Sequence, residues 1–352
     1  MKIDNYLSER KSPTLAAKLA WCWYTPYRHD EILKQYESER ELVLDTVRAL
    51  RSSFLGVGKS LRLKDEYISM RKLFQDAIDS VLLFASTNNL NILQAEDTIY
   101  DGIILMADNN IRRIPIVNKE DTLIGIFTVH DIIRLLGGIE KYESLYQEEN
   151  NDLDMILAKS VDHIAIHNPI TLSGNHSVFD AVKTMVDNEI GGIPIVDGDK
   201  LIGIITERDI LYLTPLLKEL SENNIPFVPQ KDVITVTPDT TILGAITILA
   251  KEDIRRLPVV DKGRLIGIIT TTDIIQANYT FANLFSEVLS FSVKDIMIKN
   301  TYFITPKDAI DDAINLMCHW NIGSLLIMEG DELMGIITER DVLKYAYELL
   351  KP

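Results

Sequence analysis

The 352-residue chain has little cysteine, with Cys22 and Cys318 as its only thiols. Two cysteines so far apart form neither a disulfide framework nor a metal cluster, so we expect a reducing compartment. No apolar run approaches the roughly 18 residues that a membrane span needs, and residues 1–5 have no signal-peptide core. The six histidines lack metal-ligand spacing, and no Ser-His-Asp or Cys-His set is present. We therefore expect a cytoplasmic protein that is not an enzyme, holds no metal and has no obligatory cofactor.

Basic residues are outnumbered, since 36 Lys and Arg stand against 52 Asp and Glu and give a net charge of −16. Residues 1–88 carry 14 basic and 12 acidic side chains, so the remaining chain carries −18. A body this acidic does not bind nucleic acid through its general field. Any phosphate must be held locally, by particular arginines and backbone amides.

One pattern occurs four times along the chain. Its clearest copy is Ile254–Asp261, which contains Arg-Arg-Leu-Pro, followed by Leu265–Asp273, which is Leu-Ile-Gly-Ile-Ile-Thr-Thr-Thr-Asp. The closing threonines are 78, 64 and 68 residues apart, which exceeds the common short solenoid periods. Each copy is therefore large enough to be a small βα module. The closing pairs are Thr128 and Asp131, Thr206 and Asp209, Thr270 and Asp273, and Thr338 and Asp341.

Each copy has the same predicted elements. Two β-branched runs, such as Leu257–Val260 and Leu265–Ile269, flank a tight turn and predict a hairpin. An earlier strand, Val233–Val236 in this copy, precedes a helix. Thr98–Asp101 and Ser177–Asp180 resemble the capping box of that helix. Apolar residues with a 3.6-residue period predict the helix itself; in repeats 2 and 3 they are Val178, Ala181, Val182, Met185, Ile242, Ala245, Ile246 and Leu249.

This order, with Gly, two apolar residues, Thr and Asp closing each copy, resembles the CBS domain family. Four copies in a row resemble the γ subunit of AMP-activated protein kinase and its stand-alone prokaryotic relatives. The resemblance covers roughly residues 86–346. It implies an α/β (α+β) fold in which four β-α-β-β-α repeats pair into two Bateman modules that form a disc. We expect a helical extension over 1–85, repeats 1 and 2 over 86–214, and repeats 3 and 4 over 226–350.

The four copies are of two kinds. Arg-Arg precedes the second strand in repeats 1 and 3, whereas Gly-Gly or Gly-Ser stands there in repeats 2 and 4. The chain is thus a duplicated two-repeat unit. Because duplication places the two Arg pairs equivalently, we expect their four guanidiniums to converge on a shared polar centre and to repel one another without ligand. These residues are Arg112, Arg113, Arg255, Arg256, Gly191, Gly192, Gly323 and Ser324.

The repeated polar residues suit a nucleotide. The closing Thr lies where a strand leads into a helix, whose unpaired first-turn amides and dipole favour phosphate. Its hydroxyl can donate to phosphate, and the Asp carboxylate can accept from two ribose hydroxyls. The same pair is also a capping-box arrangement that needs no ligand, and this explains one isolated copy better. Four copies in register with the Arg pairs favour a ligand.

The resemblance implies that the basic pairs line a central cavity and contact phosphates, while the closing Thr and Asp contact phosphate and ribose. The family often places a further ligand-contacting Thr in the first strand. Thr171 and Thr235 match that position, whereas Ile92 and Phe303 stand there in repeats 1 and 4, so repeats 2 and 3 are the better candidates. The residue-by-residue candidates are Arg112, Arg113, Thr128, Asp131, Thr171, Thr206, Asp209, Thr235, Arg255, Arg256, Thr270, Asp273, Thr338 and Asp341.

Arg208 and Arg340 precede the closing Asp in repeats 2 and 4. Two interpretations stay open for them, a surface salt bridge on the helix or a phosphate contact. His130 has the same position in repeat 1, and we expect a surface residue there rather than a catalytic base.

Residues 1–85 match no family. Helical spacing over Asp30–Arg51 and Lys64–Ala85, with the aromatic cluster Trp21–Tyr27, indicates either a helical cap on the repeats or a partner-binding element. Gly56–Ser60 is not expected to be a phosphate loop, because Ser53 stands where the Walker A pattern needs glycine. Among the connections, we expect a solvated linker over Ile139–Asp154, a module separator over Pro215–Pro229 and an apolar helix over Phe281–Leu289.

We therefore predict a regulatory protein that binds AMP, ADP or ATP through its repeats and reports their level to a protein partner. Two alternatives remain. The modules could hold another adenosyl ligand, such as S-adenosylmethionine or NAD, although a ligand without several phosphates would leave the Arg pairs idle. Alternatively, the chain could be a scaffold subunit with empty sites. The sequence does not distinguish a monomeric disc from a homodimer.

Overall fold

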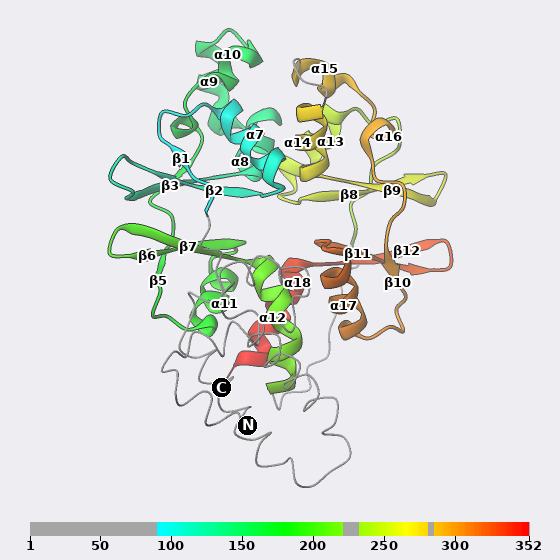
Figure 1. The fold of residues 1–352 in the computed structure, drawn as a ribbon. Helices are drawn as coiled ribbons and strands as arrows, with labels where there is room; N and C mark the ends of the chain where they lie inside the picture. Colours follow the sequence, from blue (N-terminus) through cyan, green and yellow to red (C-terminus); the bar gives the residue numbers. More distant parts are fainter. Residues whose placement is uncertain (1–89, 221–231, 281–284, 352) are drawn as a thin grey trace, which may run out of the picture.

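The computed structural model describes residues 90–220, 232–280 and 285–351. Within them the predicted order of elements occurs in all four repeats (Figure 1). The interpretations made for residues 1–85 lie outside the described residues. Repeats 1 and 2 comprise β1 Leu93–Gln94, α7 Ile99–Asn109, β2 Arg113–Val117, β3 Leu123–Thr128, α8 Val129–Leu136, β4 Ile166–His167, β5 Leu172–Ser173, α11 Val178–Asp187, β6 Gly192–Asp197, β7 Lys200–Thr206 and α12 Glu207–Leu220.

Repeats 3 and 4 have the same order, with one reduction. The expected first strand Val233–Val236 is only a single parallel bridge from Val236 to Val259. The apolar helix expected over Phe281–Leu289 is α15, Phe285–Ser290. The other elements are α13 Ile242–Lys251, β8 Arg256–Asp261, β9 Arg264–Thr270, α14 Thr271–Thr280, α16 Val293–Ile296, β10 Phe303–Ile304, α17 Ile310–Trp320, β11 Ser324–Glu329, β12 Glu332–Thr338 and α18 Glu339–Leu350.

The first helix of each repeat forms where the apolar period and the cap predict it. Thr98 and Asp101 form a reciprocal capping box on α7, with the Thr98 hydroxyl donating to Asp101 at 2.6 Å, and Ser177 and Asp180 do the same on α11. Both predicted caps are confirmed. The predicted apolar positions of α11 and α13 are all buried, so one face of each helix is committed to the core.

Each sheet has the same local register. In repeats 1, 2 and 4 the first strand pairs in parallel with the second, and in repeat 3 the bridge from Val236 to Val259 takes its place. In all four repeats the second strand forms an antiparallel hairpin with the third. A register shift interrupts each hairpin two residues after its proline or the equivalent leucine, for example between Ile116 and Val117. Such a bulge increases the local twist of the hairpin. Its recurrence in all four repeats shows that they share one backbone plan.

The repeats are arranged in two tiers. In Figure 1 the sheets of repeats 1 and 3 lie side by side above those of repeats 2 and 4, with helices on the outer faces of both tiers. One apolar core joins the helices of repeats 1 and 3, and a second joins those of repeats 2 and 4. The sheets of repeats 3 and 4 face one another across a smaller cluster, which contains Ile268, Leu326 and Ile336.

Pro215 does not end α12, which continues to Leu220. Because proline has no N–H, the carbonyl four residues earlier, that of Leu211, loses its helical donor. The Cys318 thiol of α17 lies 3.8 Å from that carbonyl oxygen and donates to it. Burial raises the pKa of Cys318 to about 12, so the thiol keeps its proton. Packing against repeat 4 therefore supports a helix that the sequence alone predicts to stop.

The Glu- and Asn-rich linker is not simply solvated. It contains η5 Glu140–Tyr142 and α9 Glu143–Glu148, and leads into α10 Leu153–Leu157. Tyr142 and Leu145 are buried in the core of repeats 1 and 3. The segment folds against the repeats in spite of its polar composition, because its few apolar side chains pack into that core.

The shared core yields a stability prediction. Ile246 of α13 is fully buried between repeats 1 and 3, so Ile246→Ala is expected to lower the free energy of unfolding by about 2–5 kcal/mol. Leu243→Ala, on the exposed side of the same helix, should change it by less than about 0.5 kcal/mol. Urea denaturation measures both. Equal effects of the two substitutions would contradict the shared core.

Candidate functional site

The hairpin register places the predicted arginines beside the predicted threonines. Arg113 is the direct cross-strand partner of Thr128, and Arg256 is that of Thr270. In repeats 2 and 4 the closing Thr faces Gly192 or Ser324 instead. Opposite residues of an antiparallel pair have Cβ atoms roughly 4.5–5.5 Å apart on one face. Arg and Thr therefore lie on one face of the sheet in repeats 1 and 3, and a small residue opens that face in repeats 2 and 4.

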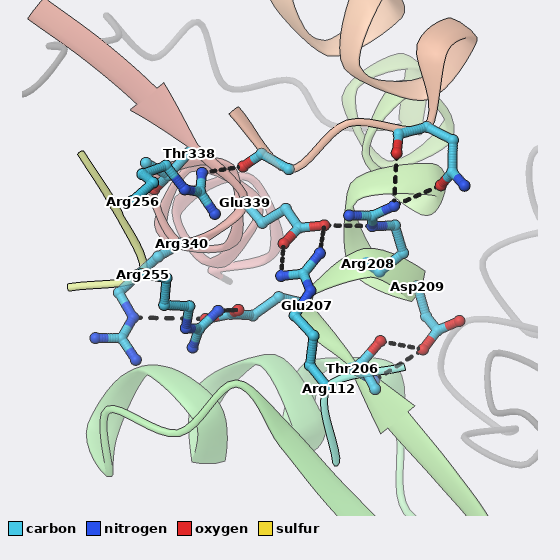
Figure 2. Close-up of polar contacts among 12 residues, drawn as sticks. Arg112, Thr206, Glu207, Arg208, Asp209, Arg255, Arg256, Thr338, Glu339 and Arg340 are labelled. Carbon is cyan, nitrogen blue, oxygen red and sulfur yellow. Dashed lines mark hydrogen bonds and ion pairs between the residues drawn. The ribbon is translucent and has the colours of Figure 1, made fainter. Parts of the chain in front are cut away.

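The four arginines of the two Arg-Arg sequence pairs come together in the middle of the molecule. They lie around two glutamates that sequence analysis missed. Arg112 donates to Glu339 through Nη1 at 2.7 Å and Nη2 at 3.3 Å, a two-pronged ion pair from repeat 1 to repeat 4 (Figure 2). Arg255 of repeat 3 makes the equivalent pair with Glu207 of repeat 2. Each glutamate directly follows a closing Thr. That position was the available signal.

Arg208 and Arg340 complete the cluster. Arg208 donates to Glu339 through Nε and to the Asn321 carbonyl at 3.0 Å. Arg340 lies 3.5 Å from Glu207 and donates to the Glu189 carbonyl at 2.8 Å. Of the two interpretations left open, the salt bridge describes these contacts, but each pair joins repeat 2 to repeat 4 rather than lying on one helix.

Arg113 and Arg256 differ from the other arginines of this cluster. Among the described residues, no carboxylate lies within salt-bridge distance of either guanidinium. Arg256 donates to the Gly323 carbonyl. Burial, followed by the charge of Arg255, lowers the pKa of Arg113 to about 10. Burial also lowers the pKa of Arg256 to about 10, because desolvation and neighbouring cations disfavour the charged form.

The glycine pair of repeat 2 makes room for the Arg pairs. A methyl group at Gly191 would lie 2.6 Å from Arg113 Nη2, 2.7 Å from Arg255 Nη2 and 2.8 Å from Glu207 Oε2. One at Gly192 would lie 2.7 Å from Arg113 Nη1. The alternation of Arg pairs and small pairs along the chain is therefore complementary packing. Arginines from the odd repeats occupy the space that the small residues of the even repeats leave.

The two glutamates stay ionised in spite of burial. Both are about 2% exposed or less, and burial alone would raise their pKa. Against that burial, Arg255 and Arg113 lower the pKa of Glu207 to about 2. Arg112 and Arg208 hold the pKa of Glu339 well below its usual value. The expected mutual repulsion of four guanidiniums is thus offset for Arg112 and Arg255.

The four closing pairs form the capping hydrogen bonds. The Thr hydroxyl donates to the Asp Oδ2 at 2.6–2.7 Å in all four repeats. In Asp131 and Asp273 both bonds from Thr reach Oδ2, which leaves Oδ1 for another donor. Burial raises the pKa of Asp131 and of Asp273. The cap is therefore formed, and a second role for the carboxylate is compatible with it.

The remaining candidates lie away from the ion pairs. Thr171 is half-buried and directly precedes β5, and Thr235 is exposed and directly precedes the bridge at Val236. Each therefore lies just ahead of the segment that pairs with β6, which begins at Gly192, or with β8, which begins at Arg256. His130, expected at the surface, is only 22% exposed and pairs with Asp253 at 2.6 Å, a contact between repeats 1 and 3.

The described part of the chain holds no group of three or more His, Cys, Asp or Glu side chains that could bind a metal ion. Within that same part, none of the helices is both long and apolar enough to span a membrane.

The buried carboxylates yield a pH-dependent prediction. Removing one partner of a buried ion pair costs about 3–5 kcal/mol, so Glu207→Gln should lose about that much stability at pH 7. Because the folded state lowers the pKa of Glu207, its stabilisation is present above pH ~4.5 and is lost as the pH falls toward 2. The difference between the two proteins should therefore shrink over that range in urea denaturation.

Glu329→Gln, at an exposed position, is the control with the same change in net charge. A Glu207→Gln deficit that stays constant between pH 7 and pH 3 would show that the carboxylate is not stabilised by the arginines.

Comparison with known proteins follows the same division into repeats. The CBS domain model matches residues 84–138, 161–214, 223–279 and 293–348. The uncharacterized protein MJ1225 of Methanocaldococcus jannaschii is 32% identical over 276 residues, covering 75% of this chain and 98% of that protein. Its crystal structure, described as that of a proposed archaeal homolog of g-AMPK, matches with a TM-score of 0.67 at 30% identity, over 75% of this chain and 99% of that chain.

Other similarities are more partial. An uncharacterized 33.4 kDa protein of Thermofilum pendens is 25% identical over 263 residues, covering 72% of this chain and 87% of that protein. Inosine-5'-monophosphate dehydrogenase of Nitrosopumilus maritimus is 35% identical over 141 residues, which are 40% of this chain and 28% of the enzyme. The matched segments together cover more than half of the sequence, and the chain belongs to the CBS domain family, with four copies of the domain.

Proposed function

We propose that this protein binds adenine nucleotides as regulatory ligands, with their phosphates near Arg113 and Arg256. The observation that carries the proposal is that the two carboxylates do not neutralise all the arginines around them. Six guanidiniums gather around two carboxylates, and Arg113 and Arg256 have no carboxylate partner in the described part of the chain. A partly desolvated arginine without a counter-ion is electrostatically costly, and a phosphate group would provide the missing charge through two-pronged hydrogen bonds.

The closing pairs supply the rest of a nucleotide site. Thr128 and Thr270 share a sheet face with Arg113 and Arg256, respectively, so one ligand could contact both. Asp131 and Asp273 use Oδ2 for the cap and can accept ribose hydroxyls through Oδ1. We retain Thr206, Asp209, Thr338, Asp341, Thr171 and Thr235 as candidate contacts in the other repeats. S-adenosylmethionine carries no phosphate and would not offset the charge of Arg113 and Arg256.

The relatives support a regulatory role rather than catalysis. The similarity to inosine-5'-monophosphate dehydrogenase is confined to 28% of that enzyme. MJ1225, which matches over nearly its whole length, is described as a proposed archaeal homolog of g-AMPK. We propose modules over 86–214 and 226–350, with a cytoplasmic protein partner that responds to the nucleotide state.

Anion binding is tested by removing the two unpaired arginines. Calorimetry of the wild-type protein should show binding of ADP and ATP and much weaker binding of adenosine, because charge-assisted hydrogen bonds contribute about 1.5–3 kcal/mol each. Arg113→Ala combined with Arg256→Ala should abolish ADP binding while stabilising the ligand-free protein slightly. Arg264→Ala, which changes an exposed arginine of repeat 3, is the control. A double variant that binds ADP normally would place the anion elsewhere.

The ribose contact is tested with a matched pair of cap variants. Asp273→Ala removes a cap and a proposed ligand contact, whereas Asp101→Ala removes the same kind of cap on α7, at an exposed position. Each should lower the free energy of unfolding by about 1 kcal/mol, but only Asp273→Ala should weaken ADP binding. Unfolding curves and calorimetry measure both. Unchanged binding in Asp273→Ala would leave the pair with a capping role alone.

A further inference from the structure

The two glutamates accept hydrogen bonds from arginine in the same bidentate geometry that a phosphate would use. Glu339 accepts hydrogen bonds from both Nη1 and Nη2 of Arg112, at 2.7 and 3.3 Å. Glu207 accepts from both Nη1 and Nη2 of Arg255. A guanidinium binds carboxylate and phosphate through the same fork of N–H groups. Arg112 and Arg255 therefore already hold an anion that belongs to the chain itself.

This resident anion is present in only half of the repeats. Glu207 and Glu339 are the first residues of α12 and α18. The equivalent first residues of α8 and α14 are Val129 and Thr271, both buried and uncharged. The unpaired arginines, Arg113 and Arg256, belong to the repeats without a glutamate. The two carboxylates of the cluster thus lie in the even repeats and the two Arg-Arg pairs lie in the odd repeats, while Arg208 and Arg340 add one arginine to each even repeat.

We propose that Glu207 and Glu339 are specificity-determining residues that limit how many phosphate charges the centre accepts. The inference rests on the proposed function and deepens it. Arg113 and Arg256 attract the first phosphate charges. Every further charge gains less, because Arg112 and Arg255 are engaged and the two carboxylates repel it across a partly dry centre. Both glutamates remain ionised at neutral pH, as their lowered pKa values require. The wild-type centre should therefore favour ligands with few phosphates.

The experiment measures the affinities of adenosine, AMP, ADP and ATP for the wild-type protein and for Glu207→Gln by calorimetry, without divalent metal ions. Glutamine keeps the shape and removes the charge. Glu207→Gln is expected to bind each nucleotide more tightly, with a gain that grows with phosphate number and reaches about tenfold or more for ATP. Adenosine should be unaffected. Glu329→Gln, with the same change in net charge at an exposed site, should leave all four affinities unchanged.

The phosphate series separates a charge effect from mere loosening of the fold, which would weaken all the nucleotides alike. Equal or weaker ATP binding by Glu207→Gln, with normal wild-type binding, overturns this inference and leaves the proposed function standing. Absence of nucleotide binding in both proteins overturns both. If Glu207→Gln does not fold, Glu339→Gln applies the same test at the equivalent position. Glu207→Asp, which keeps the charge, should retain the wild-type order of affinities, and a steepened order in that variant would also count against the inference.

Discussion

Glu207 and Glu339 connect all four repeats electrostatically. Each is buried in an even repeat, receives an arginine from an odd repeat of the opposite module, and receives a second arginine from the other even repeat. The apolar cores join repeat 1 to repeat 3 and repeat 2 to repeat 4, so these ion pairs link the two tiers at their centre. Losing one glutamate would leave two arginines without a carboxylate partner in a poorly solvated region, which is costlier than losing a surface pair.

Under the proposed function, the same cluster couples nucleotide binding to stability. The two carboxylates link the tiers but do not neutralise six arginines. Arg113 and Arg256 are left with lowered pKa values, near 10. Their unfavourable environment in the ligand-free protein is what an added anion would relieve, and mass action then converts binding into stability. Gly191 and Gly192 are needed for this arrangement of arginines, because a side chain at either position would collide with the arginines.

Local patterns in the sequence were sufficient for the repeats but not for their assembly. The helices α11 and α13, their caps and the hairpins follow from periodicity and turn chemistry, which depend on neighbouring residues only. The convergence of the Arg pairs followed from the duplication. The role of Glu207 and Glu339 did not, because their partners are 48 and 227 residues away, and a glutamate after a helix-capping Thr is otherwise an ordinary first-turn residue. The continuation of α12 past Pro215 likewise depends on Cys318, which is distant in the sequence.

The central claim is that phosphate occupies the place where positive charge is left over. A crystal structure with bound ADP tests it most directly. The account predicts phosphate oxygens within about 2.7–2.9 Å of the guanidinium nitrogens of Arg113 or Arg256, with Thr128 or Thr270 beside them. ADP bound with its phosphates outside the arginine cluster, and with both guanidiniums unchanged, would contradict it.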